Sequence, residues 1–128
     1  MTNTQLPHNH GQAMEQELAI MPSTDDFQTV ANVFKQLSDG SRIRIFWLLC
    51  HCEECVINLS AMVNMSSPAI SHHLKQLRTA NLIVSRREGK EVYYKASSSA
   101  SAQLLHHMIE KMVTITCPEG SPHKGEGT

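Results

Sequence analysis

Four cysteines have the greatest capacity for chemistry in this 128-residue chain, and two of them stand close together. Cys52 and Cys55 form a C-x-x-C pair, and His51 directly precedes it. Thiolates at this spacing suit soft ions such as Zn(II), Cd(II), Pb(II) or As(III), and Cys117 or a histidine could complete the ligand set. The pattern predicts a metal or metalloid site on Cys52, Cys55 and Cys117, which two subunits could share. Two incidental thiols on a polar connector are the alternative.

Residues 66–95 have the side chains of a nucleic-acid-binding surface. Their first part predicts a helix, because Ser67 is a good N-cap and Pro68 suits the first helical position. One face of this helix is an apolar stripe. The opposite face carries donors and cations of the kind that contact base edges and phosphates: Ser71, His72, Lys75, Gln76 and Arg78.

A β-hairpin is predicted to follow, with strands near residues 82–84 and 92–94 and a turn at residues 88–90. Arg86, Arg87 and Lys90 lie near its tip. Residues 66–95 hold six Lys or Arg and two Glu, a net charge of +4, whereas the whole chain carries −1 and the remainder therefore −5. Such segregation indicates a nucleic-acid-binding face on an otherwise acidic body. A polar-faced helix beside a basic hairpin suits the major groove and backbone of double-stranded DNA.

Apolar positions at helical spacing predict the elements that must position these residues. Further helices are expected over residues 24–37, 41–50, 59–63 and 102–116. In the second of them we expect these side chains to face inward: Ile43, Phe46, Trp47, Leu49 and Cys50. A short helix, a turn and a polar-faced helix make a helix-turn-helix, and the hairpin adds a wing. The predicted fold class is mainly α with a small β-hairpin, a dimeric winged helix-turn-helix, because the apolar stripe of the last helix is wide enough to pack on a partner subunit.

The expected organisation has three parts. Residues 1–23 form a flexible N-terminal arm, in which residues 12–21 could hold a turn or two of helix, and residues 24–117 form the DNA-binding and dimerisation domain. Residues 118–128 are expected to be a disordered tail. His8 and His10 fit a mobile polar arm better than a metal site.

Composition excludes other classes of function. No apolar run approaches the ~20 residues of a membrane span, and the N-terminus lacks the regions of a signal peptide, so we expect a cytoplasmic protein with reduced thiols. Nothing orients a third group or an oxyanion hole around the Cys and His residues, so an enzyme is not expected. A winged-helix interaction module that does not read DNA is the competing class, and the concentration of Arg and Lys in residues 71–95 argues against it.

From about residue 27 to 117 the chain resembles the ArsR/SmtB family of winged-helix transcriptional repressors. The segments that carry the resemblance are LSDGSRIRIFWLL, SSPAISHHLKQLR and LIVSRREGKEVYYK. The resemblance implies a homodimer joined by the first and last helices, which binds a roughly palindromic operator and is released by a metal, metalloid or oxidant. It also places five residues on positions that face DNA: Ser66, Ser67, Ser71, His72 and Lys75. His73 matches a position that serves the fold as much as the DNA.

The resemblance leaves the sensing site open. Many metal sensors of the family carry E-L-C-V-C-D-L here, of which this chain keeps Cys55 but has Ile57 and Asn58 in place of the second cysteine and the aspartate. The family's other metal site uses a D-x-H pair early in the last helix and an H-x-x-H or H-x-x-E pair later. The early pair is absent, while His107 and Glu110 keep the later spacing about a turn too early, and His106 could pair with Glu110.

A thiol-based response is the alternative that the resemblance suggests. Some family members place one cysteine on the second helix and one near the end of the last helix, and form a disulfide or polysulfide bridge between them. Cys50 and Cys117 match these positions loosely, each about a turn away. Cys50 could equally be a small buried hydrophobic side chain.

Overall fold

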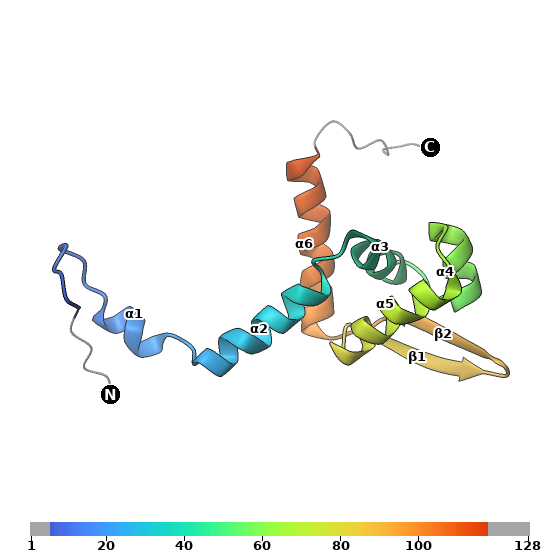
Figure 1. Ribbon diagram of the computed structural model, residues 1–128, viewed down its shortest axis with the longest axis horizontal. Coiled ribbons are helices and arrows are strands. Elements are labelled where there is room, and N and C mark those ends of the chain that lie inside the picture. The colour runs from blue at the N-terminus through green and yellow to red at the C-terminus, as the bar shows by residue number, and fades with distance from the viewer. Residues whose placement is uncertain (1–5, 118–128) are drawn as a thin grey trace. The chain divides into compact units, whose positions relative to one another are not determined.

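The computed structural model describes residues 6–117, and the tail predicted at residues 118–128 lies outside them. Figure 1 shows the elements in chain order: α1 (Glu15–Ile20), α2 (Thr24–Gln36), α3 (Gly40–Leu49), α4 (Val56–Val63), α5 (Ser67–Thr79), β1 (Ile83–Glu88), β2 (Glu91–Ala96) and α6 (Ala100–Thr116). The chain divides into two compact units, residues 1–32 and residues 33–128, and each is described by itself.

The first unit holds α1 and most of α2, and none of the residues in these helices is buried. α1 lies in the segment predicted as an arm, where a turn or two of helix was expected. The cap of α2 is Ser23, one residue before the predicted helix. Its hydroxyl accepts from the Asp26 N–H at 3.0 Å, and the Asp26 carboxylate accepts from the Ser23 N–H at 3.3 Å. This reciprocal pair satisfies two of the donors that a helix start leaves open.

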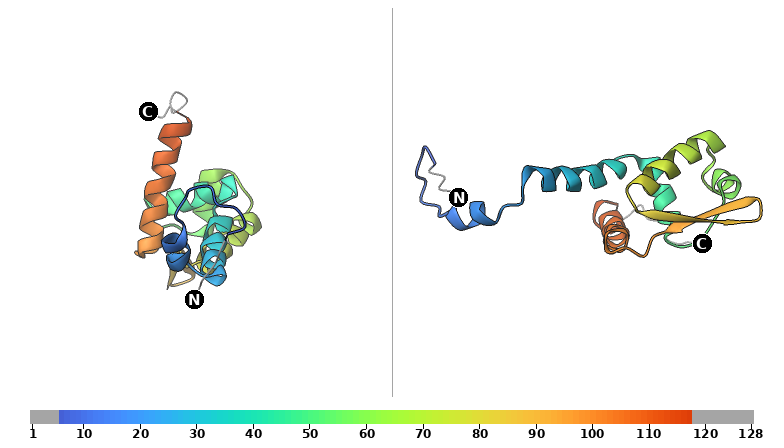
Figure 2. Two further views of the ribbon diagram at one scale, coloured as in Figure 1. Left: turned by 90° about the vertical axis from the view of Figure 1, so that its left-hand side faces the viewer. Right: turned by 90° about the horizontal axis from the view of Figure 1, so that it is seen from below.

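The second unit has one hydrophobic core, in which α3, α4 and α5 pack on one another and the hairpin packs on α3 and α5 (Figure 2). The buried apolar side chains are Ile45, Phe46, Leu49, Leu59, Val63, Ile70, Leu74, Leu77, Leu82, Ile83, Ala102 and Leu105. The predicted winged helix-turn-helix is therefore confirmed: α4 and α5 form the helix pair, of which α5 is the recognition helix, and β1 and β2 form the wing. One predicted core residue is wrong, because the Trp47 side chain is 37% exposed.

The turn between α4 and α5 has two local determinants. Asn64 adopts the left-handed conformation (φ 57°, ψ 53°), and its N–H bonds to the Ser60 carbonyl. The N-cap of α5 is Ser66 rather than the predicted Ser67, because the Ser66 hydroxyl accepts from the Ala69 N–H at 3.3 Å. Asparagine tolerates the left-handed conformation better than most residues, so Asn64 and Ser66 together determine this turn locally.

The wing is a two-stranded antiparallel sheet in which Ile83 pairs with Ala96 and Glu88 pairs with Glu91. Gly89, at φ +64°, makes the tight turn between the strands. Two backbone hydrogen bonds also join Glu54 to Tyr94 on β2, at 3.0 and 2.9 Å. The segment between α3 and α4, residues 51–55, is called the connector from here on, and these bonds fix it against the wing.

α6 buries only Ala102 and Leu105 in the core. The remaining apolar side chains of the helix include five exposed ones: Leu104, Met108, Met112, Val113 and Ile115. The wide apolar stripe expected from the sequence is therefore present, and much of it faces solvent in a single subunit. No helix among the described residues is long and apolar enough to cross a membrane.

Candidate functional site

The solvent-facing side of α5 carries the side chains predicted to contact DNA. The exposed members of this set are Ser66, Ser67, Ser71, His72 and Lys75, and Gln76 is half-buried. The opposite side of α5 is buried through Ile70, His73, Leu74 and Leu77. The apolar stripe therefore fixes the helix in the core and leaves its donors and cations available to an external ligand.

A groove of about 370 Å³ joins this face to the wing. It is lined by Ser71, Leu74, Lys75, Arg78, Thr79 and Tyr94, so four polar side chains of α5 stand beside the aromatic side chain of β2. Arg87 and Lys90 on the hairpin are exposed. One helix and one basic hairpin are thus presented as parts of a single surface.

Arg86 differs from the other predicted contacts because its guanidinium already has protein partners. Its Nε and Nη2 donate to the two carboxylate oxygens of Glu53 at 2.8 and 3.0 Å, and its Nη1 donates to Glu88 at 2.6 Å. The hydrogen bond from Arg86 holds the pKa of Glu53 below its usual value, and Glu53 in turn raises the pKa of Arg86. Because Glu53 lies in the connector, this bidentate pair is a second link between connector and wing.

His73 lies on the inner side of the recognition helix and is 8% exposed. Its Nδ1 accepts from the Nε of Arg42 at 3.2 Å. Burial lowers the pKa of His73, although the nearby Asp39 carboxylate opposes this shift. Asp39 caps α3 by accepting from the Arg42 N–H at 3.0 Å. His73 therefore serves the fold, since a neutral imidazole links α5 to the start of α3.

Cys52 and Cys55 both lie in the connector, and both are half-buried. The Cys52 thiol donates to the Leu48 carbonyl at 3.3 Å, and burial raises its pKa. Cys55 is the N-cap residue of α4. Cys117 is exposed at the end of α6. Within one subunit these three thiols do not form a cluster of ligand atoms in the described chain.

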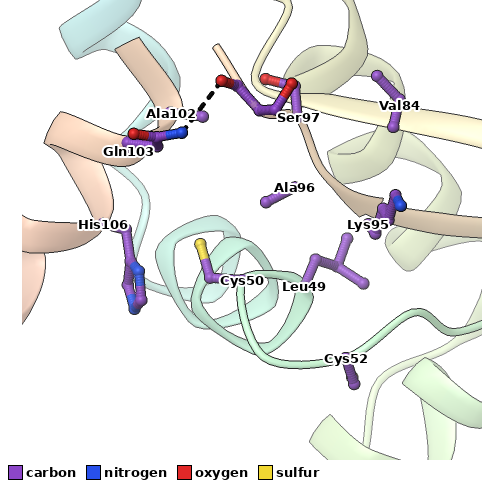
Figure 3. Close-up of a pocket in the computed structure, with 11 residues that line it drawn as sticks. Leu49, Cys50, Cys52, Val84, Lys95, Ala96, Ser97, Ala102, Gln103 and His106 are labelled. Carbon is purple, nitrogen blue, oxygen red and sulfur yellow. Dashed lines mark hydrogen bonds between the residues drawn. The ribbon is translucent and has the colours of Figure 1, made fainter. Parts of the chain in front are cut away.

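Cys50, the other predicted redox cysteine, borders a cavity of about 440 Å³ between the end of α3, β2 and α6. Figure 3 shows its sulfur pointing into this cavity, with His106 at the edge. Burial raises the pKa of the Cys50 thiol to about 11, and the Glu110 carboxylate adds to the rise. Thiols react as thiolates, so Cys50 is a poor nucleophile at neutral pH in this arrangement.

Three other side chains that can bind a metal do come together, where the end of α3 meets α6. His51, His106 and Glu110 place one ligand atom each within 4.8 Å of the others, and they are the one such group among the residues that the structure describes. The sequence suggested that His106 pairs with Glu110, which the structure confirms at 3.2 Å. The sequence placed His51 beside the thiol pair but gave no signal that it lies next to His106, from which it is separated by 55 positions.

The charge of Glu110 is favoured in this cluster. Burial acts to raise its pKa, but the charge of His106 and hydrogen bonds from Trp47 and His106 outweigh that effect, so the pKa lies below its usual value. Trp47 Nε1 donates to Glu110 Oε2 at 3.3 Å, which explains why the indole is not fully buried as predicted.

The second helix of the helix-turn-helix has a polar outer face, and a basic wing lies beside it. These features define the class of protein: a winged helix-turn-helix DNA-binding regulator. Residues 39–85 match the family described as bacterial regulatory protein, arsR family. The chain belongs to the ArsR/SmtB family of transcriptional repressors, and it is not an enzyme.

Individual relatives agree with this assignment. The chain is 33% identical over 102 residues to the transcriptional repressor SmtB homolog of Synechocystis sp., a match that covers 77% of each chain. It is 39% identical over 83 residues to the arsenic resistance transcriptional regulator ArsR2 of Pseudomonas putida, which covers 64% of this chain and 71% of the relative. Its fold is similar to the crystal structure of NolR from Sinorhizobium fredii, with a TM-score of 0.64, 26% identity, and coverage of 79% of this chain and 95% of the other.

Proposed function

We propose that this repressor binds a roughly palindromic DNA operator as a homodimer and leaves it when a soft metal or metalloid ion binds cysteine thiolates. The observation that carries the proposal is the outer face of α5, where Ser71, His72 and Lys75 are exposed together while the other side of the helix is buried. A helix of this kind, with its N-terminal residues free, fits the major groove.

Each exposed side chain has a role in this proposal. Ser71, His72 and Gln76 read base edges, because they stand in the middle of the helix. Ser66 and Ser67 at its start, together with Lys75, Arg87 and Lys90, contact phosphates. Arg86 contributes less than the other cations, because three of its five N–H donors are already bonded to Glu53 and Glu88.

A second copy of the chain is proposed as the cover for the exposed apolar faces. Phe27, Val30 and Phe34 on α2 are each 50% exposed, and α6 exposes five further apolar side chains. Apolar surface of this extent is removed from water when a partner packs on it. A two-fold dimer would present two recognition helices to successive major grooves about 34 Å apart.

The effector is proposed to bind Cys52 and Cys55, with Cys117 supplied by the partner subunit. The two connector thiols lie on either side of Glu54, whose backbone is bonded to β2. An ion that draws these thiols together would therefore act on the wing directly. The relative named for arsenic resistance supports a thiophilic effector. The redox alternative on Cys50 and Cys117 is less favoured, because burial raises the pKa of Cys50 to about 11.

The DNA-binding part is tested by Lys75→Ala. We expect weaker binding to an operator selected from random duplexes, and a salt dependence of log K shallower by about 0.9, because one phosphate contact is lost. Fluorescence anisotropy at several salt concentrations measures both. Lys111→Ala, an exposed lysine of α6, is the matched control and should bind as the wild type does. Equal slopes for Lys75→Ala and the wild type would exclude the α5 face.

The effector part is tested by Cys55→Ser. The variant should bind operator with wild-type affinity, because Cys55 lies outside the DNA face, but Cd(II) or As(III) should no longer release it. Anisotropy of the preformed complex during metal titration measures release, and native mass spectrometry counts bound ions. Normal release of Cys55→Ser by both ions would remove Cys55 from the sensing mechanism.

A further inference from the structure

We infer that His51, His106 and Glu110 form a second metal site, built within one subunit from nitrogen and oxygen ligands and specific for a divalent transition ion such as Zn(II). It shares no ligand with the proposed thiolate site. It also differs from a site across two last helices, because one of its ligands follows α3. The inference does not depend on DNA binding.

The geometry of the three ligand atoms is that of one face of a tetrahedral site. His106 Nε2 lies 3.2 Å from His51 Nε2 and 3.2 Å from Glu110 Oε2, and His51 Nε2 lies 3.5 Å from the same oxygen. Ligands at ~2.0–2.1 Å from a tetrahedral Zn(II) are separated from one another by about 3.3–3.4 Å. An ion could therefore bind all three atoms with little change in their positions.

Hydrogen bonds alone satisfy this arrangement less well. Each Nε2 carries at most one proton, and that of His106 is within bonding distance of two acceptors at once. Two neutral imidazoles can therefore make hydrogen bonds across only two of the three distances that separate these atoms. A cation bound between the three atoms interacts favourably with both nitrogen lone pairs and with the carboxylate, and so satisfies all three atoms at once.

Neighbouring side chains hold the ligands in this geometry. The Trp47 ring packs on His51 with centroids 4.1 Å apart, and His51 meets His106 edge to face at 4.9 Å. The Trp47 indole N–H donates to the Glu110 oxygen. His106 and Glu110 are four residues apart on α6, so one helical face presents both. Outer contacts that orient the ligands in this way are characteristic of built metal sites.

The fourth position has access to solvent. Exposed His51 and Glu110 lie at the surface, and His106 also borders the 440 Å³ cavity beside Cys50. Water or a small anion could complete the coordination there. The mixture of two imidazoles and one carboxylate suits Zn(II), Co(II) or Ni(II), whereas As(III) and Cd(II) prefer thiolates. As(III) therefore distinguishes the thiolate site, whereas Zn(II), which also suits thiolates, reports on the histidine–carboxylate site only after the thiolate ligands are removed.

Metal at this site would join the end of α3 to α6. α3 packs on the recognition helix, and α6 carries the exposed apolar face assigned to the dimer. The ion would therefore limit movement between the DNA-reading part of the subunit and its last helix. We expect it to raise the thermal unfolding temperature of the protein, since it binds the folded chain and not the unfolded one.

The test uses the full-length chain with Cys52→Ser, Cys55→Ser and Cys117→Ser, which removes the thiolate site. Native mass spectrometry should find one Zn(II) per subunit, and Co(II) should give the visible absorption of a four-coordinate ion without a thiolate charge-transfer band. In that background His51→Gln, His106→Gln or Glu110→Gln should weaken Zn(II) binding at least about tenfold. His107→Gln, an exposed neighbour on α6, is the matched control.

Circular dichroism verifies that each variant is folded, so a loss of binding cannot be attributed to unfolding. Failure of the protein with these three cysteine replacements to bind Zn(II) would overturn the inference. So would equal Zn(II) affinity in His106→Gln and His107→Gln. Neither result depends on whether Lys75→Ala weakens operator binding, so the metal site and the DNA-binding proposal are tested independently.

Discussion

At the scale of single residues, the chain uses its histidines in three different ways. His72 is exposed on the recognition helix, His73 is buried behind it, and His106 is part of a ligand cluster. The helical period already places His72 on the polar face of α5, and the family resemblance adds that His73 serves the fold. His73 is buried because it shares one face of the helix with Ile70, Leu74 and Leu77.

The buried His73 predicts a pH dependence of stability. Burial lowers its pKa in the folded protein, so the unfolded chain takes up a proton first as pH falls past the ordinary value of 6.5. The contribution of neutral His73 to the free energy of unfolding is therefore complete above pH 6.5 and is lost as pH falls through the lower pKa of the folded protein. The thermal unfolding temperature should fall more steeply below pH 6.5 in the wild type than in His73→Gln. His72→Gln should retain the wild-type slope, and equal slopes for all three proteins would contradict the assignment.

At the scale of elements, the recognition helix and wing were predictable because their signals are local. Pro68, the apolar period of α5 and the turn at Gly89 each lie within a few residues of what they determine. The contacts between elements were not predictable, since the pairs Arg42–His73, Glu53–Arg86 and His51–His106 are separated by 31, 33 and 55 positions. No periodic pattern records such pairings. Trp47 was misplaced for the same reason.

The pairing of Glu53 with Arg86 predicts an effect on DNA binding. Glu53→Gln removes one of the two carboxylates that hold Arg86, so two of its N–H donors become more available to a phosphate. Operator affinity should rise, and the salt dependence of log K should become steeper by up to about 0.9. Glu91→Gln makes the same change in charge on the wing without an Arg86 contact, and controls for the general loss of a negative charge. A slope unchanged from that of the control would mean that Arg86 does not reach DNA.

At the scale of the whole molecule, a single subunit leaves apolar helix faces uncovered. The exposed side chains of α6 extend along most of its length, whereas its buried side chains are confined to the first half. The sequence predicted this stripe through its width. The sequence also suggests that two subunits could share a site on Cys52, Cys55 and Cys117, but no local pattern determines how the partner's Cys117 would reach the other two thiols.

Replacement of an exposed apolar residue on α6 should separate the subunits. Met112 is 53% exposed, and a two-fold interface would contain it twice. Burial of a methionine contributes about 1.5–3 kcal/mol, so Met112→Glu should raise the dimer dissociation constant about a hundredfold or more. Sedimentation velocity measures the change. Ser101→Glu, at an exposed polar position of the same helix, should remain dimeric, and dimeric Met112→Glu would exclude this face.

The bonds between Glu54 and Tyr94 also restrict how this protein can vary. They join the connector to β2 through one residue pair, and Glu54 of that pair lies between the two connector thiols in the sequence. Insertion or deletion of one residue there would shift the register of that pair or reorient the hairpin. Homologues that keep a wing in this position should therefore tolerate exchange of amino acids in the connector far better than any change in its length.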